Sequence, residues 1–302
     1  MYKKNTLSIY TGDTMGNSNI KYSFDSNVST NSRITIKQTF ENIQSKVSKN
    51  MEFFNGINVR VFGSWEESYE YSQISDGRMG FTTYPINSDL RNIYLQTKEV
   101  NRTSTSLITG FGASSKSISE TAAHELGHTF DYYFATPDAE IVNELREMYT
   151  LGAEHREKYK KKYNKLLEKY KTRNGLSDSE KFKQAWKQDV ENKFMNKNDT
   201  SSLNERFKLG YFSPTYSFDN KFSKIKLKDG IDDKELLMAD RAREEIFAQL
   251  FAYAFGECCD NKEKELIIQT YPACYKVVKN YINEYFGIDV DKTSQINLDI
   301  SL

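Results

Sequence analysis

Short apolar stretches separated by Gly, Asn, Ser and Asp make up the N-terminal part of the chain, a spacing typical of strands and turns. One helical pattern interrupts them, because apolar residues recur at intervals of three and four from Ile36 to Val47 and predict a helix over about 35–50. Strands are expected at about residues 6–10, 19–25, 57–62, 81–84 and 92–97. These elements predict a small mixed sheet accompanied by one helix.

After Ser117 the apolar residues follow helical periodicity through most of the chain. Helices are expected at about residues 118–134, 138–172, 178–196, 201–209, 233–256, 262–270 and 273–286. A sheet-containing N-terminal part followed by a run of helices predicts an α+β fold.

The length of 302 residues, with 38% apolar and 14% aromatic residues, suits one sizeable core at the upper edge of a single domain, with two domains as the alternative. We expect a single unit over residues 1–302 with four parts. These are a sheet-containing lobe at 1–117, a central helix at 118–137, a helical insertion at 138–232 and a helical C-terminal lobe at 233–302.

The charges are balanced, since Lys plus Arg and Asp plus Glu both number 42. We therefore expect neither nucleic acid nor an anionic membrane as the main partner, and the lack of a long apolar run predicts no transmembrane segment. Residues 155–173 are an exception, being mostly basic with Tyr and Leu at helical spacing. A nucleic-acid-binding stripe is the alternative there, but we favour a solvated helix that packs through its Tyr and Leu face, with His155 on the surface.

The motif His-Glu-Leu-Gly-His, from His124 to His128, carries the most specific chemistry of the sequence. Two His residues four apart lie on one helix face, so both rings can reach one Zn²⁺, and Glu125 beside them is placed to act on a water molecule. The four residues ending at Glu120 fit a capping box that would start this helix. Gly127 would let another backbone come close, which a solvated helix does not need, since Gly costs about 1 kcal/mol relative to Ala in a helix interior. The motif therefore predicts a zinc site rather than two His and a Glu on a solvated face.

A zinc hydrolase needs a third protein ligand. Asp131 shares a face with His124, but seven residues of helix rise by about 10 Å, too far for one ion, so Asp131 is expected either to accept a hydrogen bond near the site or to pack helices. The helical run at 241–255 offers two adjacent acids. Glu245 shares a face with small residues that permit close helix approach, so it is the favoured ligand, and Glu244 is the alternative.

The segments HELGHTFDYY and, much later, EEIFAQLFAYAF resemble the zinc protease domain of anthrax lethal factor and the related secreted Pro-Pro endopeptidases. The resemblance covers roughly residues 33–137 and 233–286, and its specific part is these two short motifs. It implies a zincin-like zinc metalloprotease, in which residues 92–97 correspond to the edge strand beside the cleft.

We therefore expect a zinc endopeptidase of the type with two His and one Glu as ligands. His124, His128 and Glu245 would hold Zn²⁺, and Glu125 would take the proton of a metal-activated water and deliver it to the leaving amine. The substrate would be a protein or peptide that adds to the sheet beside residues 92–97.

Two positions depart from the resembled family. Met238 stands where the family has a catalytic Tyr seven residues before the ligand Glu, so Tyr216, in a loop that contains Pro214, is the expected substitute donor to the oxyanion, with simple packing as its alternative. Gln249 replaces a second acid, and it can still orient a metal ligand, although without charge. These departures support a second hypothesis, a non-catalytic zincin-like binding or assembly protein, and a toxin-type effector protease is a third.

The N-terminal sequence starts basic but lacks the apolar core and cleavage site of a signal peptide, which predicts a cytoplasmic protein or export by a non-Sec route. Three Cys residues, two of them the adjacent Cys258 and Cys259, are expected to be reduced and structural. The family resemblance, in contrast, implies secretion.

Overall fold

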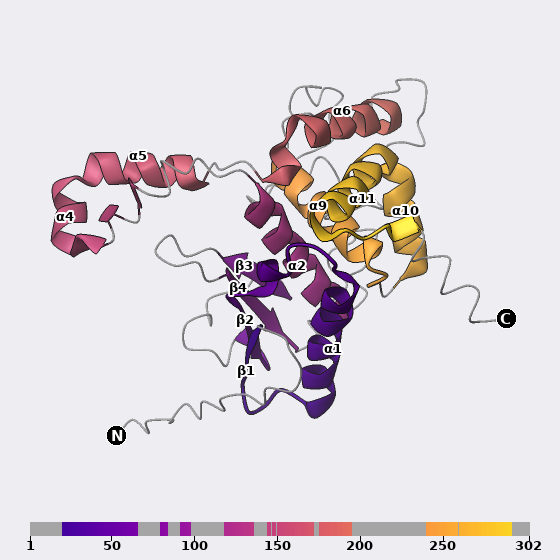
Figure 1. The fold of residues 1–302 in the computed structure, drawn as a ribbon, viewed down its shortest axis with the longest axis horizontal. Helices are drawn as coiled ribbons and strands as arrows, with labels where there is room; N and C mark the ends of the chain where they lie inside the picture. The colour runs from indigo at the N-terminus through magenta and orange to yellow at the C-terminus, as the bar shows by residue number, and fades with distance from the viewer. Residues whose placement is uncertain are drawn as a thin grey trace, which may run out of the picture.

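The computed structural model describes residues 20–65, 79–83, 91–97, 118–135, 144–171 apart from 146 and 149, 175–194, 240–258 and 260–291. Over these residues the fold is α+β, as expected, with a small mixed sheet and a mostly helical remainder (Figure 1). The predicted strand at 6–10 and the predicted helix at 201–209 lie outside the described residues.

The sheet has four strands, which lie in the order β1 (Lys21–Phe24), β2 (Ile57–Phe62), β4 (Arg91–Gln96) and β3 (Gly80–Thr83). The first three run parallel, and β3 runs antiparallel to β4. The predicted strands from residue 19 onward are thus confirmed to within about two residues at each end.

The prediction that residues 92–97 form the sheet edge is wrong. Ile93 on β4 pairs with Val59 on one side and with Thr82 on the other, so β4 is an inner strand. The short strand β3 is the outermost strand on this side of the described sheet. The residue pattern within a strand does not show which strands pair with it, because pairing depends on contacts with segments that are remote in sequence.

Helix α1 (Thr30–Lys46) begins earlier and ends earlier than the predicted span of 35–50. Ser29 caps it, since the Ser29 side chain accepts a hydrogen bond from the backbone N–H of Ser32 over 3.1 Å. A short 3₁₀ helix, η1 (Met51–Phe54), then leads into β2.

Helix α2 (Ile118–Phe134) occupies the predicted bounds and lies between the sheet and the C-terminal helices (Figure 1). It contacts β3 and β4 on one side and helix α9 (Asp240–Ala254) on another. Every residue from Glu120 to Gly127 is buried. The side chains of α1, α2 and one sheet face share a single core, which includes Phe40, Val59 and Leu126.

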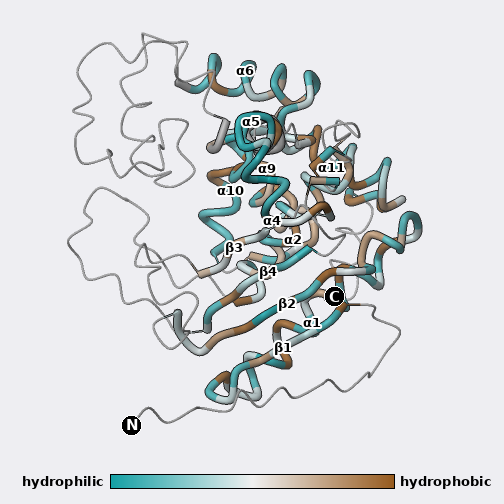
Figure 2. The backbone as a smooth tube through the Cα atoms, turned by 90° about the vertical axis from the view of Figure 1, so that its left-hand side faces the viewer, coloured by the Kyte–Doolittle hydropathy of each residue, from teal (hydrophilic) through white to brown (hydrophobic). Residues whose placement is uncertain are grey.

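The C-terminal helices pack around α2 and α9, and the bounds of this group are η3 (Leu176–Asp178), α6 (Glu180–Phe194), α10 (Asn261–Thr270) and α11 (Pro272–Phe286). Phe130 of α2 and Phe286 of α11 meet edge to face with ring centroids 4.8 Å apart, which ties this group to the central helix. Hydrophilic residues line much of α6 (Figure 2). None of the described helices has the length and hydropathy that a membrane span requires.

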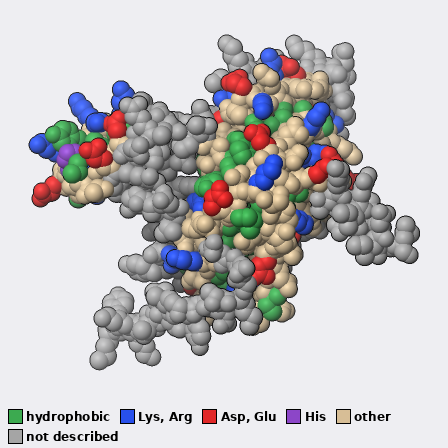
Figure 3. Space-filling view, in the orientation of Figure 1, with side chains coloured by type: hydrophobic (Ala, Val, Ile, Leu, Met, Phe, Trp, Pro, Cys, Tyr) green, Lys and Arg blue, Asp and Glu red, His purple; other side chains and the backbone are tan. Residues whose placement is uncertain are grey.

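The predicted helix at 138–172 is not continuous where it is described. It contains α4 (Gly152–Lys158) and α5 (Lys160–Lys171), separated at Tyr159, whose φ of −109° and ψ of 31° depart from helical values. Both helices lie to one side of the main body (Figure 1), and Figure 3 shows Lys and Arg side chains on this arm. Tyr163 and Leu166 pack with Leu145 and Met148 in a small separate cluster, as expected for a Tyr and Leu face, whereas Tyr159 of the same stripe is 42% exposed.

Candidate metal centre

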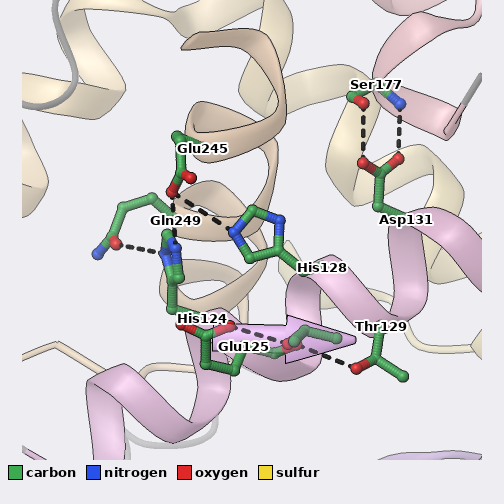
Figure 4. A network of polar contacts seen from close by, with 9 residues as sticks. His124, Glu125, His128, Thr129, Asp131, Ser177, Glu245 and Gln249 are labelled. Atoms are coloured by element: carbon green, nitrogen blue, oxygen red, sulfur yellow. Dashed lines mark hydrogen bonds and ion pairs between the residues drawn. The ribbon is translucent and has the colours of Figure 1, made fainter. Parts of the chain in front are cut away.

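Two helices bring the three predicted ligands together. Helix α2 supplies His124 and His128 from consecutive turns, and α9 supplies Glu245 (Figure 4). One carboxylate oxygen of Glu245, Oε2, lies 3.1 Å from Nε2 of His124 and 3.4 Å from Nε2 of His128. One ligand atom from each residue lies within 4.8 Å of the others, so this group could hold a metal ion.

The close approach of the two helices depends on Gly127. A Cβ atom built on Gly127 would lie 2.8 Å from both the Cα and the carbonyl oxygen of Ala248, main-chain atoms that cannot move aside alone. Real Cβ atoms essentially never come so close to other heavy atoms. The expectation that Gly127 admits another backbone beside the metal-binding face is confirmed.

Two of the three ligand spacings fit a tetrahedral metal site. Metal bonds of about 2.0–2.1 Å at tetrahedral angles separate neighbouring ligand atoms by about 3.3 Å. The two contacts of Glu245 with the imidazole nitrogens, at 3.1 and 3.4 Å, lie on either side of that value. The side chains of His128 and Glu245 each keep 12% exposure, so the group is sheltered but not sealed from solvent.

The hydrogen bonds around His124 turn its Nε2 towards the Glu245 carboxylate. The Gln249 amide nitrogen donates to the Glu120 carboxylate over 2.6 Å, so its carbonyl oxygen Oε1 is the atom that faces Nδ1 of His124 at 2.9 Å. Nδ1 must therefore carry a proton, and in the neutral ring Nε2 presents a lone pair to the Glu245 carboxylate. Two lone pairs at 3.1 Å repel each other unless a positive charge lies with them, which is the situation that a metal ion relieves.

In the metal-free chain, a proton on His128 supplies the positive charge that a metal ion would bring. Burial alone would lower the pKa of His128, but the charge of Glu245 and its hydrogen bond raise it to about 9, with smaller contributions from Glu125 and Glu244. Burial would raise the pKa of Glu245, but the two histidines hold it well below its usual range. The site is thus built to keep a positive charge between two imidazoles and one carboxylate.

The carboxylate of Glu125 contacts the sheet. The Thr82 hydroxyl on β3 lies 2.8 Å from the Glu125 carboxylate oxygen Oε2 and 3.0 Å from the Glu125 backbone carbonyl. The absence of a side chain at Gly80, on the same strand, makes room, because a Cβ there would come 2.9 Å from Cγ and Oε1 of Glu125. The outermost strand of the described sheet therefore fixes the carboxylate of Glu125.

Glu244 faces a different set of groups from Glu245 and does not join the three ligand atoms. The pKa of Glu244 is raised to about 7, mainly by burial and against the effect of His128, with smaller contributions from Asp131, Asp178 and Glu245. Glu244 also hydrogen-bonds to Tyr132, whose pKa is raised by burial and by this carboxylate. The geometry thus favours Glu245 as the ligand over its alternative.

Asp131 serves the packing of the helices. Its carboxylate accepts hydrogen bonds from the Ser177 backbone N–H at 2.7 Å and from the Ser177 hydroxyl at 2.8 Å (Figure 4), and so attaches η3 to α2. The close packing leaves no room for a side chain at Gly175, where a Cβ would lie 2.5 Å from the Asp131 carboxylate. Of the two expected roles, the described contacts support the packing role.

The sequence singled out Gln249 and Gly127, but not the groups that hold Glu125 or the contact between Glu120 and Gln249. Thr82 and Gly80 act on Glu125 from a four-residue strand, and the role of Glu120 beyond helix capping depends on α9. One signal was available, since a Gly and a Thr two residues apart on a strand lie on one face. Tyr216 and Met238 lie outside the described residues, so the oxyanion donor at Tyr216 stays a prediction.

The comparisons with known proteins do not assign a function to the site. No protein-family model, no characterised protein and no solved structure matches the chain. The functional argument therefore rests on the geometry of the site and on the chemistry of its residues.

Proposed function

We propose that this protein is a zinc-dependent endopeptidase with a zincin-like fold, of the type that its motifs resemble. One observation carries the proposal. A carboxylate oxygen of Glu245 lies 3.1 and 3.4 Å from the two imidazoles of the His-Glu-Leu-Gly-His helix, although 116 residues separate Glu245 from that motif. Two imidazoles and one carboxylate are a ligand set typical of catalytic zinc, which keeps a further position open.

Each residue of the site has a defined task in peptide hydrolysis. A zinc ion held by His124, His128 and Glu245 would supply Lewis-acid polarisation of the scissile carbonyl and a lowered pKa for water, towards about 7. Glu125 takes the proton of the attacking water and later delivers it to the leaving amine. Thr82 holds the Glu125 carboxylate in place for both proton transfers.

Strand β3 is the proposed docking edge for the substrate. One edge of β3 pairs with β4, and no other described strand pairs with its second edge. A peptide that adds there would pair through main-chain groups, which any sequence provides. Because Gly80 and Thr82 of this strand contact Glu125, the main chain of such a peptide would pass close to the general base.

Metal analysis and a peptide-library assay test the proposal. We expect about one zinc per chain, lost in His128→Ala and Glu245→Ala but retained in Glu244→Ala, the adjacent acid that serves as the matched control. Glu125→Gln should keep zinc and the melting temperature but lose roughly 10²–10⁴-fold or more in cleavage rate, because the amide cannot accept a proton.

Two results would contradict the proposal. Equal cleavage by the wild type and Glu125→Gln would remove the catalytic role of Glu125. Zinc binding without cleavage of any library peptide would favour the non-catalytic binding protein, the alternative that Met238 supports. An effector protease would cleave the library but show a strong preference for proteins of another cell, which a proteome-wide cleavage screen measures.

A further inference from the structure

A buried chain of polar groups connects the carboxylate of Glu120 to Nδ1 of His124, the ring nitrogen that does not face Glu245. Oε1 of Glu120 lies 2.6 Å from the amide nitrogen of Gln249, and the amide oxygen of Gln249 lies 2.9 Å from Nδ1 of His124. Glu120 is 1% exposed and Gln249 is fully buried. Figure 4 shows the Gln249 side chain directed at the His124 ring.

The side-chain amide of Gln249 makes the orientation of the His124 ring depend on Glu120. Glu120 and His124 lie one turn apart on α2, and Gln249 reaches between them from α9, one turn after Glu245. An amide group has a donor end and an acceptor end, so whatever holds one end decides which atom faces the other side. An ionised carboxylate only accepts, and it therefore turns the NH₂ group towards itself and the carbonyl oxygen towards the imidazole.

We propose that Glu120 is a positioning residue of the metal centre, whose negative charge acts through Gln249 to fix the tautomer of His124 and to strengthen Nε2 as a ligand. Metal-binding histidines commonly donate their second N–H to a carboxylate or a carbonyl, which orients the ring and raises its basicity. Here the side chain of Gln249 lies between the Glu120 carboxylate and His124, so the carboxylate acts through one additional hydrogen bond. The inference rests on the proposed metal site, but it does not depend on peptide hydrolysis.

A role confined to packing is the competing explanation, since Glu120 and Gln249 also join α2 to α9. The two explanations differ in what the negative charge does. If the charge only supports packing, its removal lowers stability and leaves the zinc affinity unchanged. If the charge orients His124, its removal weakens zinc binding, and a charge moved to position 249 restores it.

Three variants separate these outcomes. Glu120→Gln removes the charge at nearly constant shape and should weaken zinc binding by roughly 10–100-fold, the usual cost of losing a partner of a ligand histidine. Gln249→Glu alone places two carboxylates in contact and should lower stability. The double variant Glu120→Gln with Gln249→Glu puts the carboxylate directly on His124 and should regain the wild-type zinc affinity to within about threefold.

Zinc affinity is measured by competition with a chromophoric chelator, and the melting temperature of each metal-free variant is measured alongside. Asp189→Asn is the matched control, because Asp189 is also a buried acid, 3% exposed, but lies on α6 and accepts hydrogen bonds from the backbone N–H groups of Ala273 and Cys274. It should leave zinc affinity unchanged.

The inference is overturned if Glu120→Gln binds zinc as tightly as the wild type, or if the double variant folds but does not recover affinity. Failure of both Glu120→Gln and the double variant to fold would also overturn it, because the groups would then serve the fold. Wild-type protein that binds no zinc would overturn the proposed function together with this inference, whereas an unchanged Glu120→Gln variant overturns the inference alone.

Discussion

The Thr82 hydroxyl lies 2.8 Å from the carboxylate of Glu125 and links the outermost strand of the described sheet to the general base of the proposed enzyme. The same hydroxyl lies 3.0 Å from the Glu125 backbone carbonyl, which also accepts from the Thr129 hydroxyl at 3.1 Å. Because a hydroxyl has a single proton to donate, Thr82 shares it between the carboxylate and the carbonyl. The strand that would bind a peptide thus also holds the residue that would act on it.

Thr82→Val should lower turnover without affecting the metal. Val keeps the shape of Thr but removes the donor, and a hydrogen bond to a charged group contributes about 1.5–3 kcal/mol, so turnover should fall by roughly tenfold or more. Zinc content should not change, since Thr82 does not belong to the three ligand residues. Steady-state kinetics and metal analysis measure the two effects.

Thr83→Val is the matched control for this prediction. Thr83 follows on the same strand, and successive side chains of a strand point to opposite faces, so it is directed away from Glu125. Similar losses of turnover in both variants would mean that the strand itself, rather than the Thr82 hydroxyl, had been disturbed.

Gly127→Ala should destabilise the protein, which is opposite to the usual effect of this substitution. In an ordinary helix interior the change stabilises by about 1 kcal/mol. Here the new Cβ would lie 2.8 Å from main-chain atoms of Ala248, and overpacking of this kind costs about 1–3 kcal/mol. It would also push Glu245 away from the histidines, so urea unfolding and zinc affinity should both show a loss.

A second variant tests the cause of that loss. Ala248→Gly should not rescue Gly127→Ala, because the clash involves the Cα and carbonyl oxygen of residue 248, which Gly retains. An increase in unfolding free energy for Gly127→Ala would contradict the close approach of the two helices.

Helix α2 was readable from the sequence because its signals are local. Two His residues four apart, the acids at Glu120 and Glu125 and the interior Gly127 all lie within one helical span, and α2 has the predicted bounds. Glu245 was also distinguishable from Glu244, since the small residues on one face of the later helix indicated which side packs closely. These features depend on periodicity and side-chain size, which a sequence displays directly.

The features that the sequence did not reveal depend on pairing between distant segments. The placement of β3 outside β4 is decided by a register such as Thr82 with Ile93, which no pattern within either strand encodes. The helix is interrupted at Tyr159, where the sequence has no Gly or Pro that would predict a break. The contact of Glu120 with Gln249 required the packing of α2 on α9, and so its role was invisible before the fold was known.

Asp131 should make the protein more stable as the pH falls through a limited range. Burial raises the pKa of Asp131 to about 6 in the folded protein, from an ordinary value of 3.8, against the effect of its hydrogen bonds with Ser177. Between these two values the folded state binds the proton and the unfolded state does not, so stability decreases as the pH rises. The ionised carboxylate therefore costs stability above about pH 6.

The comparison of the wild type with Asp131→Asn isolates this effect, because Asn does not titrate. Between pH 7 and pH 4 the unfolding free energy of the wild type should rise relative to the variant by at most about 3 kcal/mol. Urea unfolding at several pH values measures the difference. A constant difference across this range would show that Asp131 stays ionised in the folded protein.

Zinc binding at neutral pH should release about one proton, and that proton should come from His128. Since the pKa of His128 is raised to about 9 in the metal-free protein, this ring is protonated at pH 7, yet a metal ligand must present its lone pair. Zinc affinity should therefore rise by about tenfold for each pH unit between about pH 6 and 8.

The protonated His128 also stabilises the metal-free protein. This stability is present in full below the ordinary pKa of 6.5 and is lost as the pH rises through about 9. The gain in melting temperature on zinc binding should therefore increase over this window. Calorimetric titration in two buffers of different ionisation enthalpy counts the protons, and His155→Gln, which removes the histidine of α4, should give the same count. Zinc binding at pH 7 without proton release would mean that His128 is neutral beside Glu245, and the contact between them would then not be an ion pair.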